Sequence, residues 1–332
     1  MRLCLEEICL SKAINYTAHL TSSKSLVTLY EETRAGFIAL ALEKNRKATP
    51  FVEEAKALKV IASKAKNPQG LLKMTEIRGS ILTAAGISDK ANNHLAEEDR
   101  IEAIKGLINK FLEPAGKQFV DELVYRFLLT RGDSLGGSIR NLAGSVGEQK
   151  FSRALIATLS IEGKSYRWFH SKSMKWIERS ADDSDIELNL KGLNWQSAGP
   201  RTLIYNLTVP MVQKNVDLSL FSVAPDEIGI TKNKESTVNN PKKYLALGEL
   251  KGGIDPAGAD EHWKTANSAL DRIRKGFAKQ RLSPKTFFVG AAIEKSMANE
   301  IYRQLQDGIL SNAANLTNES QTVSLCKWLI NL

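Results

Sequence analysis

The sequence has few cysteines, and their pattern excludes both a disulfide framework and a zinc site. Only three are present, Cys4, Cys9 and Cys326. The number is odd, and the spacing is not that of zinc ligands. We therefore expect free thiols in a reducing cytoplasm.

Long apolar runs are also missing. No stretch approaches the ~18 apolar residues that a membrane span needs, so we expect no membrane span. Glu6 and Glu7 interrupt what would be the apolar core of a secretory signal, which argues against such a signal. Met1 opens the sequence, and we expect an intact chain.

The charge balance is modestly basic. The 332 residues carry 46 Lys and Arg against 37 Asp and Glu, a formal net charge of +9. This excess favours a polyanionic partner without proving one. The length allows one large domain or two moderate ones, and neither internal repeats nor coiled-coil heptads are evident.

The first part of the chain has helical apolar spacing and few strand-like runs. We expect helices over 25–43, over a segment that Pro50 opens, and over 97–111. After residue 130 the pattern changes. We read 131–137, RGDSLGG, as a loop in which Asp133 caps a helix running to Leu159.

Apolar strand-like runs dominate the remainder, with helices between the later ones. A polar segment, 232–243, reads as a solvated excursion between two strands. The order predicts a mixed α/β fold, a core sheet flanked by helices and joined to an N-terminal helical domain. We expect strands at 165–170, 201–209, 216–223, 243–252 and 285–293, and helices at 262–277 and 296–306.

Three charged residues stand out within apolar strands. Glu249 and Lys251 are two apart on one predicted strand, so their side chains share a face. Asp217 interrupts the preceding strand and would join them if the two strands pair. Two carboxylates and one ammonium suit metal-assisted phosphodiester hydrolysis. The alternatives are a strand-end aspartate bound to backbone and a surface Glu249–Lys251 ion pair.

These residues match the PD-(D/E)xK nuclease signature, which alone is weak. More specific runs are GELKGGIDPAGADEHWKTANSALDRIR, VDLSLF and RGDSLGGSIRN. Together they resemble the AvaI/BsoBI-type restriction endonucleases. The resemblance extends over most of the chain and is firmest over 131–277.

The resemblance implies a cytoplasmic, homodimeric, Mg2+-dependent enzyme that cleaves double-stranded DNA at the palindrome CYCGRG and leaves 5′ overhangs. It implies a helical DNA-gripping region at 1–128 and a PD-(D/E)xK catalytic domain at 129–332. A cognate DNA methyltransferase is implied by the class, without direct contact.

The resemblance also implies roles for single residues. Asp217, Glu249 and the carbonyl of Leu250 would bind the metal, with Lys251 near the attacking water or a phosphate oxygen. His262 is a candidate general base or water-positioning group, because its ordinary pKa lies near neutrality. A DNA contact by His262 is the alternative.

Further residues are candidate DNA contacts. Asp255 could accept from a base amino group, and Glu261 could support the site, although a helix N-terminal acid has a structural role of its own. Lys214 could contact phosphate or guanine, Lys90 could reach a groove, and Arg140 could touch phosphate or pair with an acid. The chain also has several basic clusters, such as Arg272-Arg274-Lys275. Each cluster taken alone reads as a solvent-exposed face, but several clusters together could supply contacts to DNA phosphates.

Two other functions stay open at this point. A less specific repair or structure-specific nuclease would have the same fold, and a DNA-binding protein with an inactive site would lack the chemistry. The complete set of Asp217, Glu249 and Lys251 argues against the inactive protein.

Overall fold

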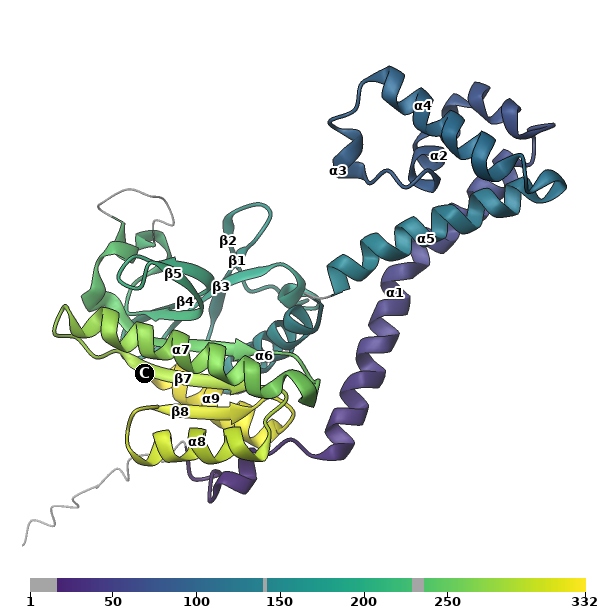
Figure 1. Cartoon of the computed structure of the whole chain (residues 1–332). Coiled ribbons are helices and arrows are strands. Elements are labelled where there is room, and N and C mark those ends of the chain that lie inside the picture. Colours follow the sequence, from purple (N-terminus) through teal and green to yellow (C-terminus); the bar gives the residue numbers. More distant parts are fainter. Residues whose placement is uncertain (1–16, 140–141, 229–235) are drawn as a thin grey trace, which may run out of the picture. The chain divides into compact units, whose positions relative to one another are not determined.

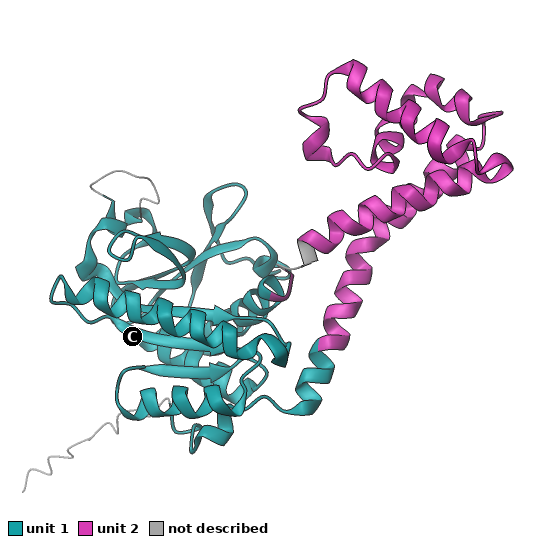
Figure 2. Ribbon diagram, in the orientation of Figure 1, with its two compact units in different colours: residues 1–36, 144–332 teal, residues 37–143 magenta. Residues whose placement is uncertain are grey.

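The computed structural model describes residues 17–139, 142–228 and 236–332. Within these ranges, no helix is both long and apolar enough to cross a membrane. The internal contacts divide the chain into two compact units, residues 1–36 with 144–332 and residues 37–143 (Figure 2). Each unit has its own core.

The unit of residues 37–143 is helical, as predicted. Its core contains Leu58, Ile81, Leu107 and Phe127, contributed by four different helices. The main helices are α1 (Tyr30–Ala62, which begins in the other unit), α2 (Arg78–Ala84), α3 (Asp89–Asn92), α4 (Glu97–Leu107) and α5 (Phe119–Ile139).

Two local predictions are wrong in this unit. Pro50 lies inside α1, because the helix-favouring residues around it continue the helix across the missing N–H. Residues 131–137 belong to α5 and form no loop, so Asp133 does not cap a helix. Within this helical stretch, the Arg131 guanidinium lies 5.4 Å from the ring centroid of Phe51 and 5.5 Å from that of Phe127.

The other unit contains an eight-stranded mixed sheet in the order β2-β1-β3-β4-β5-β6-β7-β8 (Figure 1). Neighbours are antiparallel from β2 to β6 and parallel from β6 to β8. The strands are β1 (Tyr166–His170), β2 (Lys175–Glu178), β3 (Leu190–Gln196), β4 (Pro200–Val209), β5 (Lys214–Phe221), β6 (Tyr244–Lys251), β7 (Lys285–Gly290) and β8 (Asn312–Asn315).

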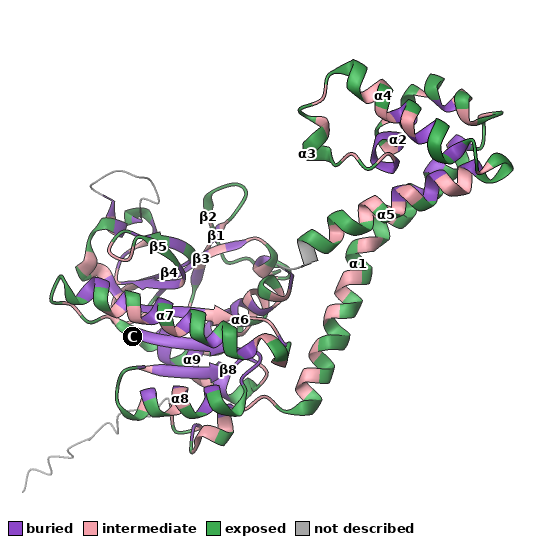
Figure 3. Ribbon diagram, viewed as in Figure 1, coloured by how far each residue is buried: buried purple, intermediate pink, exposed green. Residues whose placement is uncertain are grey.

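Helices cover both faces of this sheet. On β7, Phe288 packs on the face of α7 (Ala259–Ala278) and α8 (Lys295–Gln306). Phe287 and Val289 pack on the face of α6 (Leu142–Ile161) and α9 (Glu319–Asn331). Figure 3 shows the central strands buried between these layers. The mixed α/β fold class is therefore confirmed, and so are the five predicted strands; β2, β3, β8 and α9 had not been predicted.

Short helical turns connect the elements. The polar segment predicted at 232–243 contains two of them from residue 237 onward, and its earlier part lies outside the described residues. The 3-10 turns are Ser23–Leu26, Pro68–Lys73, Thr75–Ile77, Gly116–Gln118, Ile186–Leu188, Pro225–Glu227, Thr237–Asn239, Pro241–Lys243 and Pro256–Gly258, and Ile108–Leu112 is a π-helical turn.

Candidate active site

Antiparallel pairing of β5 with β6 brings the three charged residues together. The register pairs Leu218 with Gly248, which places Asp217 beside Glu249. Lys251 Nζ lies 3.0 Å from Asp217 Oδ2 and 2.9 Å from Glu249 Oε2. The backbone N–H of Leu250 donates to Asp217 Oδ2 at 2.9 Å. The sheet therefore builds one charged cluster from two neighbouring strands.

Burial makes this cluster electrostatically costly. Glu249 is only 3% exposed, and its Oε1 is enclosed without a hydrogen-bond partner. Burial, together with the charge of Asp217, raises the pKa of Glu249 to about 7. Burial alone would lower the pKa of Lys251, but the two carboxylates outweigh it and raise that pKa. One ammonium thus faces two carboxylates, and a further cation would be favoured here.

A small cavity beside the cluster contains a third carboxylate that the sequence did not reveal. Glu148, on α6, lines it together with Asp217 and Lys251. Glu148 Oε2 accepts from Asn206 Nδ2 at 2.8 Å. Burial raises the pKa of Glu148 and the charge of Asp217 adds to this, while the hydrogen bond from Asn206 opposes it. The cavity volume is about 180 Å3.

The strand geometry at Asn206 explains how this residue reaches Glu148. The β4–β5 ladder pairs Tyr205 with Leu218 and Leu207 with Val216, so Asn206 lies opposite Asp217. Asn206 has a left-handed φ of 51°, a conformation that asparagine tolerates better than most residues. Asn206 thus links the third carboxylate to β4, the strand that pairs with the strand bearing Asp217.

A close helix–loop contact holds Glu148 near the site. At Gly147, the residue before it, a Cβ would lie 2.3 Å from the Cα of Gly252. Only glycine therefore lets α6 approach the loop that follows Lys251 so closely. The one sequence signal for this contact is a glycine, Gly147, inside a predicted helix and just before an acidic residue.

His262 lies beside the same loop. It is exposed on the first turn of α7, and Cβ atoms at Gly253 and Gly258 would come within 3.4 and 3.3 Å of its Nε2. No hydrogen bond or ion pair joins His262 to Asp217, Glu249 or Lys251 within the described part of the chain. The imidazole thus lies beside the loop that follows Lys251.

The structure does not bring the other predicted residues into the cluster. Asp255 is exposed and caps the turn Pro256–Gly258 by accepting from Ala257 N at 3.0 Å. Glu261 is exposed at the start of α7, and Lys214 is exposed as the first residue of β5. Lys90 is exposed on α3 in the other unit. Arg140 lies outside the described residues.

Comparisons with known proteins identify the family of the chain. The chain is 58% identical over 318 residues to the type II restriction enzyme AvaI of Nostoc sp., covering 96% of this chain and 99% of that protein. It is 54% identical over 318 residues to the type II restriction enzyme BsoBI of Geobacillus stearothermophilus, covering 95% and 97%. Residues 16–332 match the family described as restriction endonuclease BsobI. The chain therefore belongs to the BsobI restriction endonuclease family, a family of site-specific deoxyribonucleases.

Proposed function

We propose that this endonuclease is Mg2+-dependent and cuts both strands of duplex DNA at the palindrome CYCGRG, leaving 5′ overhangs. The observation that carries the proposal is the convergence of Asp217, Glu249 and Lys251 at the end of β6 in a chain of this family. The relatives are named as type II restriction enzymes, which favours this function over a less specific nuclease or an inactive DNA-binding protein.

The residues present fit a hard divalent cation. Glu249 Oε1 is enclosed and unpaired, and Mg2+ prefers oxygen ligands. Asp217, Glu249 and the carbonyl of Leu250 would hold the ion. The described residues contain no cluster of three or more His, Cys, Asp or Glu side chains that could bind a metal, so water and substrate would complete the coordination. When bound, the ion would lower the pKa of a water ligand and stabilise charge on the phosphate.

Lys251 and His262 would act on the water and the phosphate. The Lys251 ammonium has three N–H donors, and Asp217 and Glu249 accept two of them. The third is available for the attacking water or a phosphate oxygen. His262 is exposed beside the loop after β6, and in our proposal it accepts the proton of the attacking water.

We propose that the DNA is held by residues on both units and that the enzyme works as a homodimer in the cytoplasm. One active site cuts one strand, so a symmetric double cut requires two-fold symmetry. A cognate methyltransferase would protect host DNA without touching this protein. The proposed contacts come from the helical DNA-gripping region 1–128 and the catalytic domain 129–332, namely Lys90, Arg140, Lys214, Asp255 and Glu261.

A plasmid digest with Mg2+, followed by sequencing of the cut ends, tests the proposal. We expect discrete fragments that end at CYCGRG, and no cleavage by Asp217→Asn or Lys251→Ala. The control Lys279→Ala changes an exposed lysine at the end of α7 and should cut normally. A smear would favour the less specific nuclease, and binding without cutting would favour the inactive protein.

A further inference from the structure

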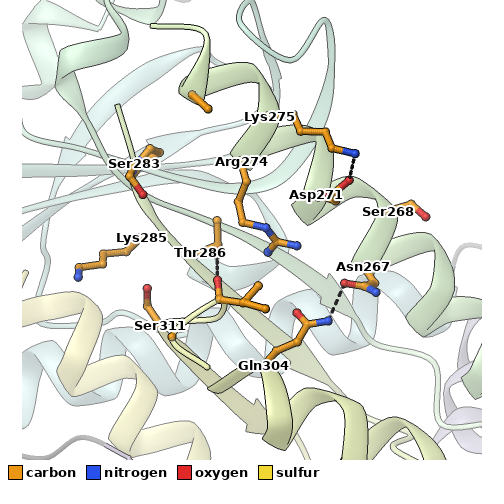
Figure 4. Close-up of a pocket in the computed structure, with 14 residues that line it drawn as sticks. Asn267, Ser268, Asp271, Arg274, Lys275, Ser283, Lys285, Thr286, Gln304 and Ser311 are labelled. Atoms are coloured by element: carbon orange, nitrogen blue, oxygen red, sulfur yellow. Dashed lines mark hydrogen bonds and ion pairs between the residues drawn. The ribbon is translucent and has the colours of Figure 1, made fainter. Parts of the chain in front are cut away.

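A second cavity, of about 760 Å3, lies between α7, α8 and the start of β7 (Figure 4). Its volume is within the range of small-molecule sites. Its lining is mostly polar and includes one arginine, two lysines and one aspartate, together with several hydroxyl groups. The residues that carry the argument are Asn267, Asp271, Arg274, Ser283, Lys285 and Ser311.

This cavity is separate from the candidate active site. Strands β6 and β7 are parallel and pair Ala246 with Lys285 and Lys251 with Gly290. Lys285 lines the cavity, whereas Lys251 belongs to the charged cluster. Along β6, Ala246 and Lys251 are five residues apart, which is about 16 Å at the usual rise per strand residue. The cavity therefore lies at the opposite end of the two strands.

Arg274 is the unusual group in this cavity. Its guanidinium extends toward the space bounded by Asn267, Gln304 and Thr286 (Figure 4), and its Nη1 is enclosed without a hydrogen-bond partner. Burial lowers the pKa of Arg274, while Asp271 opposes this. Asp271 itself pairs with Lys275 at 2.6 Å. A guanidinium that is partly desolvated and unpaired is unfavourable, and an anion would remove that cost.

The wall beside Arg274 is held in one orientation by a hydrogen-bonded chain. Glu300 can only accept: it receives Trp263 Nε1 at 2.7 Å and Asn267 Nδ2 at 3.1 Å. Asn267 Oδ1 must then face Gln304, whose Nε2 donates to it at 3.0 Å. This leaves Gln304 Oε1 enclosed and unpaired. The chain thus fixes this wall of the cavity. Gln304 Oε1 needs a donor, whereas the enclosed Nη1 of Arg274 is the group that an anion would satisfy.

We propose that this cavity binds a phosphate group, with Arg274 as the main cationic donor. Lys285 is exposed and lines the cavity with the hydroxyl groups of Ser283 and Ser311. Guanidinium and ammonium groups are the usual partners of phosphate oxygens. Phosphate fits better than a carboxylate because it offers more oxygens to donors arranged around it. The phosphate belongs either to a small phosphate ester or to a nucleic-acid backbone.

Binding of inorganic phosphate to the metal-free full-length protein tests the proposal. Thermal unfolding would be followed in EDTA while phosphate replaces chloride at constant ionic strength. We expect phosphate to stabilise the wild type, and Arg274→Ala to weaken apparent phosphate affinity at least about tenfold, as expected for a lost charge-assisted hydrogen bond. Arg303→Ala is the matched control, because it removes an exposed arginine of the neighbouring helix α8 that does not line the cavity; it should behave as wild type.

Other outcomes are equally decisive. The proposal fails if phosphate does not stabilise the wild type, if it stabilises the Arg274→Ala and Arg303→Ala variants equally, or if acetate stabilises the wild type as much as phosphate does. Should Arg274→Ala not fold, Lys285→Ala and Ser311→Ala must each weaken phosphate binding. Titrations with a mononucleotide and with a noncognate DNA duplex identify which molecule carries the phosphate group. Only the molecule that binds in this cavity should lose affinity in Arg274→Ala.

Discussion

Replacing Glu249 by glutamine should stabilise the metal-free protein at pH 8 and at the same time abolish Mg2+-dependent cleavage. The glutamine would keep the shape of the side chain and an oxygen that can accept from Lys251, but it would carry no charge. The ionised Glu249 is buried beside Asp217, and its Oε1 has no partner. The same charge that we propose for metal binding therefore destabilises the fold without metal.

The magnitude follows from the pKa. Its rise from 4.5 to about 7 in the folded protein corresponds to about 3 kcal/mol at 1.36 kcal/mol per unit. Between these two pH values the folded state binds more protons than the unfolded state. The free energy of unfolding therefore falls as pH rises through this window and levels off above pH 7. Relative to Glu249→Gln, the wild type should lose about 3 kcal/mol between pH 4.5 and pH 8.

Urea unfolding in EDTA, followed by circular dichroism at several pH values, measures this difference. Glu76→Gln is the control, because Glu76 is exposed and should give no such pH-dependent gain. If the stability difference between Glu249→Gln and wild type did not grow with pH, the burial argument would be refuted. Cleavage by Glu249→Gln would separately remove this residue from the proposed metal site.

Three further substitutions test the surroundings of the cluster. Gly147→Ala should lower the free energy of unfolding in urea by about 1–3 kcal/mol, because the added Cβ meets Gly252 at 2.3 Å. Gly144→Ala, where the added Cβ has open space, should lower it less. Equal losses in the two variants would contradict the close contact. Glu148→Gln removes a negative charge beside the site and should raise the Mg2+ concentration needed for half-maximal cleavage; an unchanged requirement would exclude that role. His262→Ala should lower the single-turnover cleavage rate far more than DNA affinity, whereas equal losses would assign His262 to DNA contact.

Much of the fold was predictable because its signals are local. Continuous apolar runs marked five of the eight strands, as expected for strands that are buried on both faces, and the charged residues Asp217, Glu249 and Lys251 interrupted these runs visibly. Strands β2 and β8 were not predicted because they are only four residues long, too short for a periodic pattern. The glycines of 131–137 suggested a loop, but α5 continues through them, because glycine only weakens a helix and tertiary packing can outweigh that preference.

The sequence by itself determined which charged residues form the cluster, because two of them lie two apart on one strand and the third interrupts a neighbouring apolar strand. Only the tertiary structure decided that Glu148 lines a cavity beside Asp217 and Lys251. Only the tertiary structure, likewise, leaves Nη1 of Arg274 enclosed without a hydrogen-bond partner. Both facts depend on contacts between segments that are distant in the chain. Local periodicity carries no information about such contacts, since they arise when whole helices pack on the sheet.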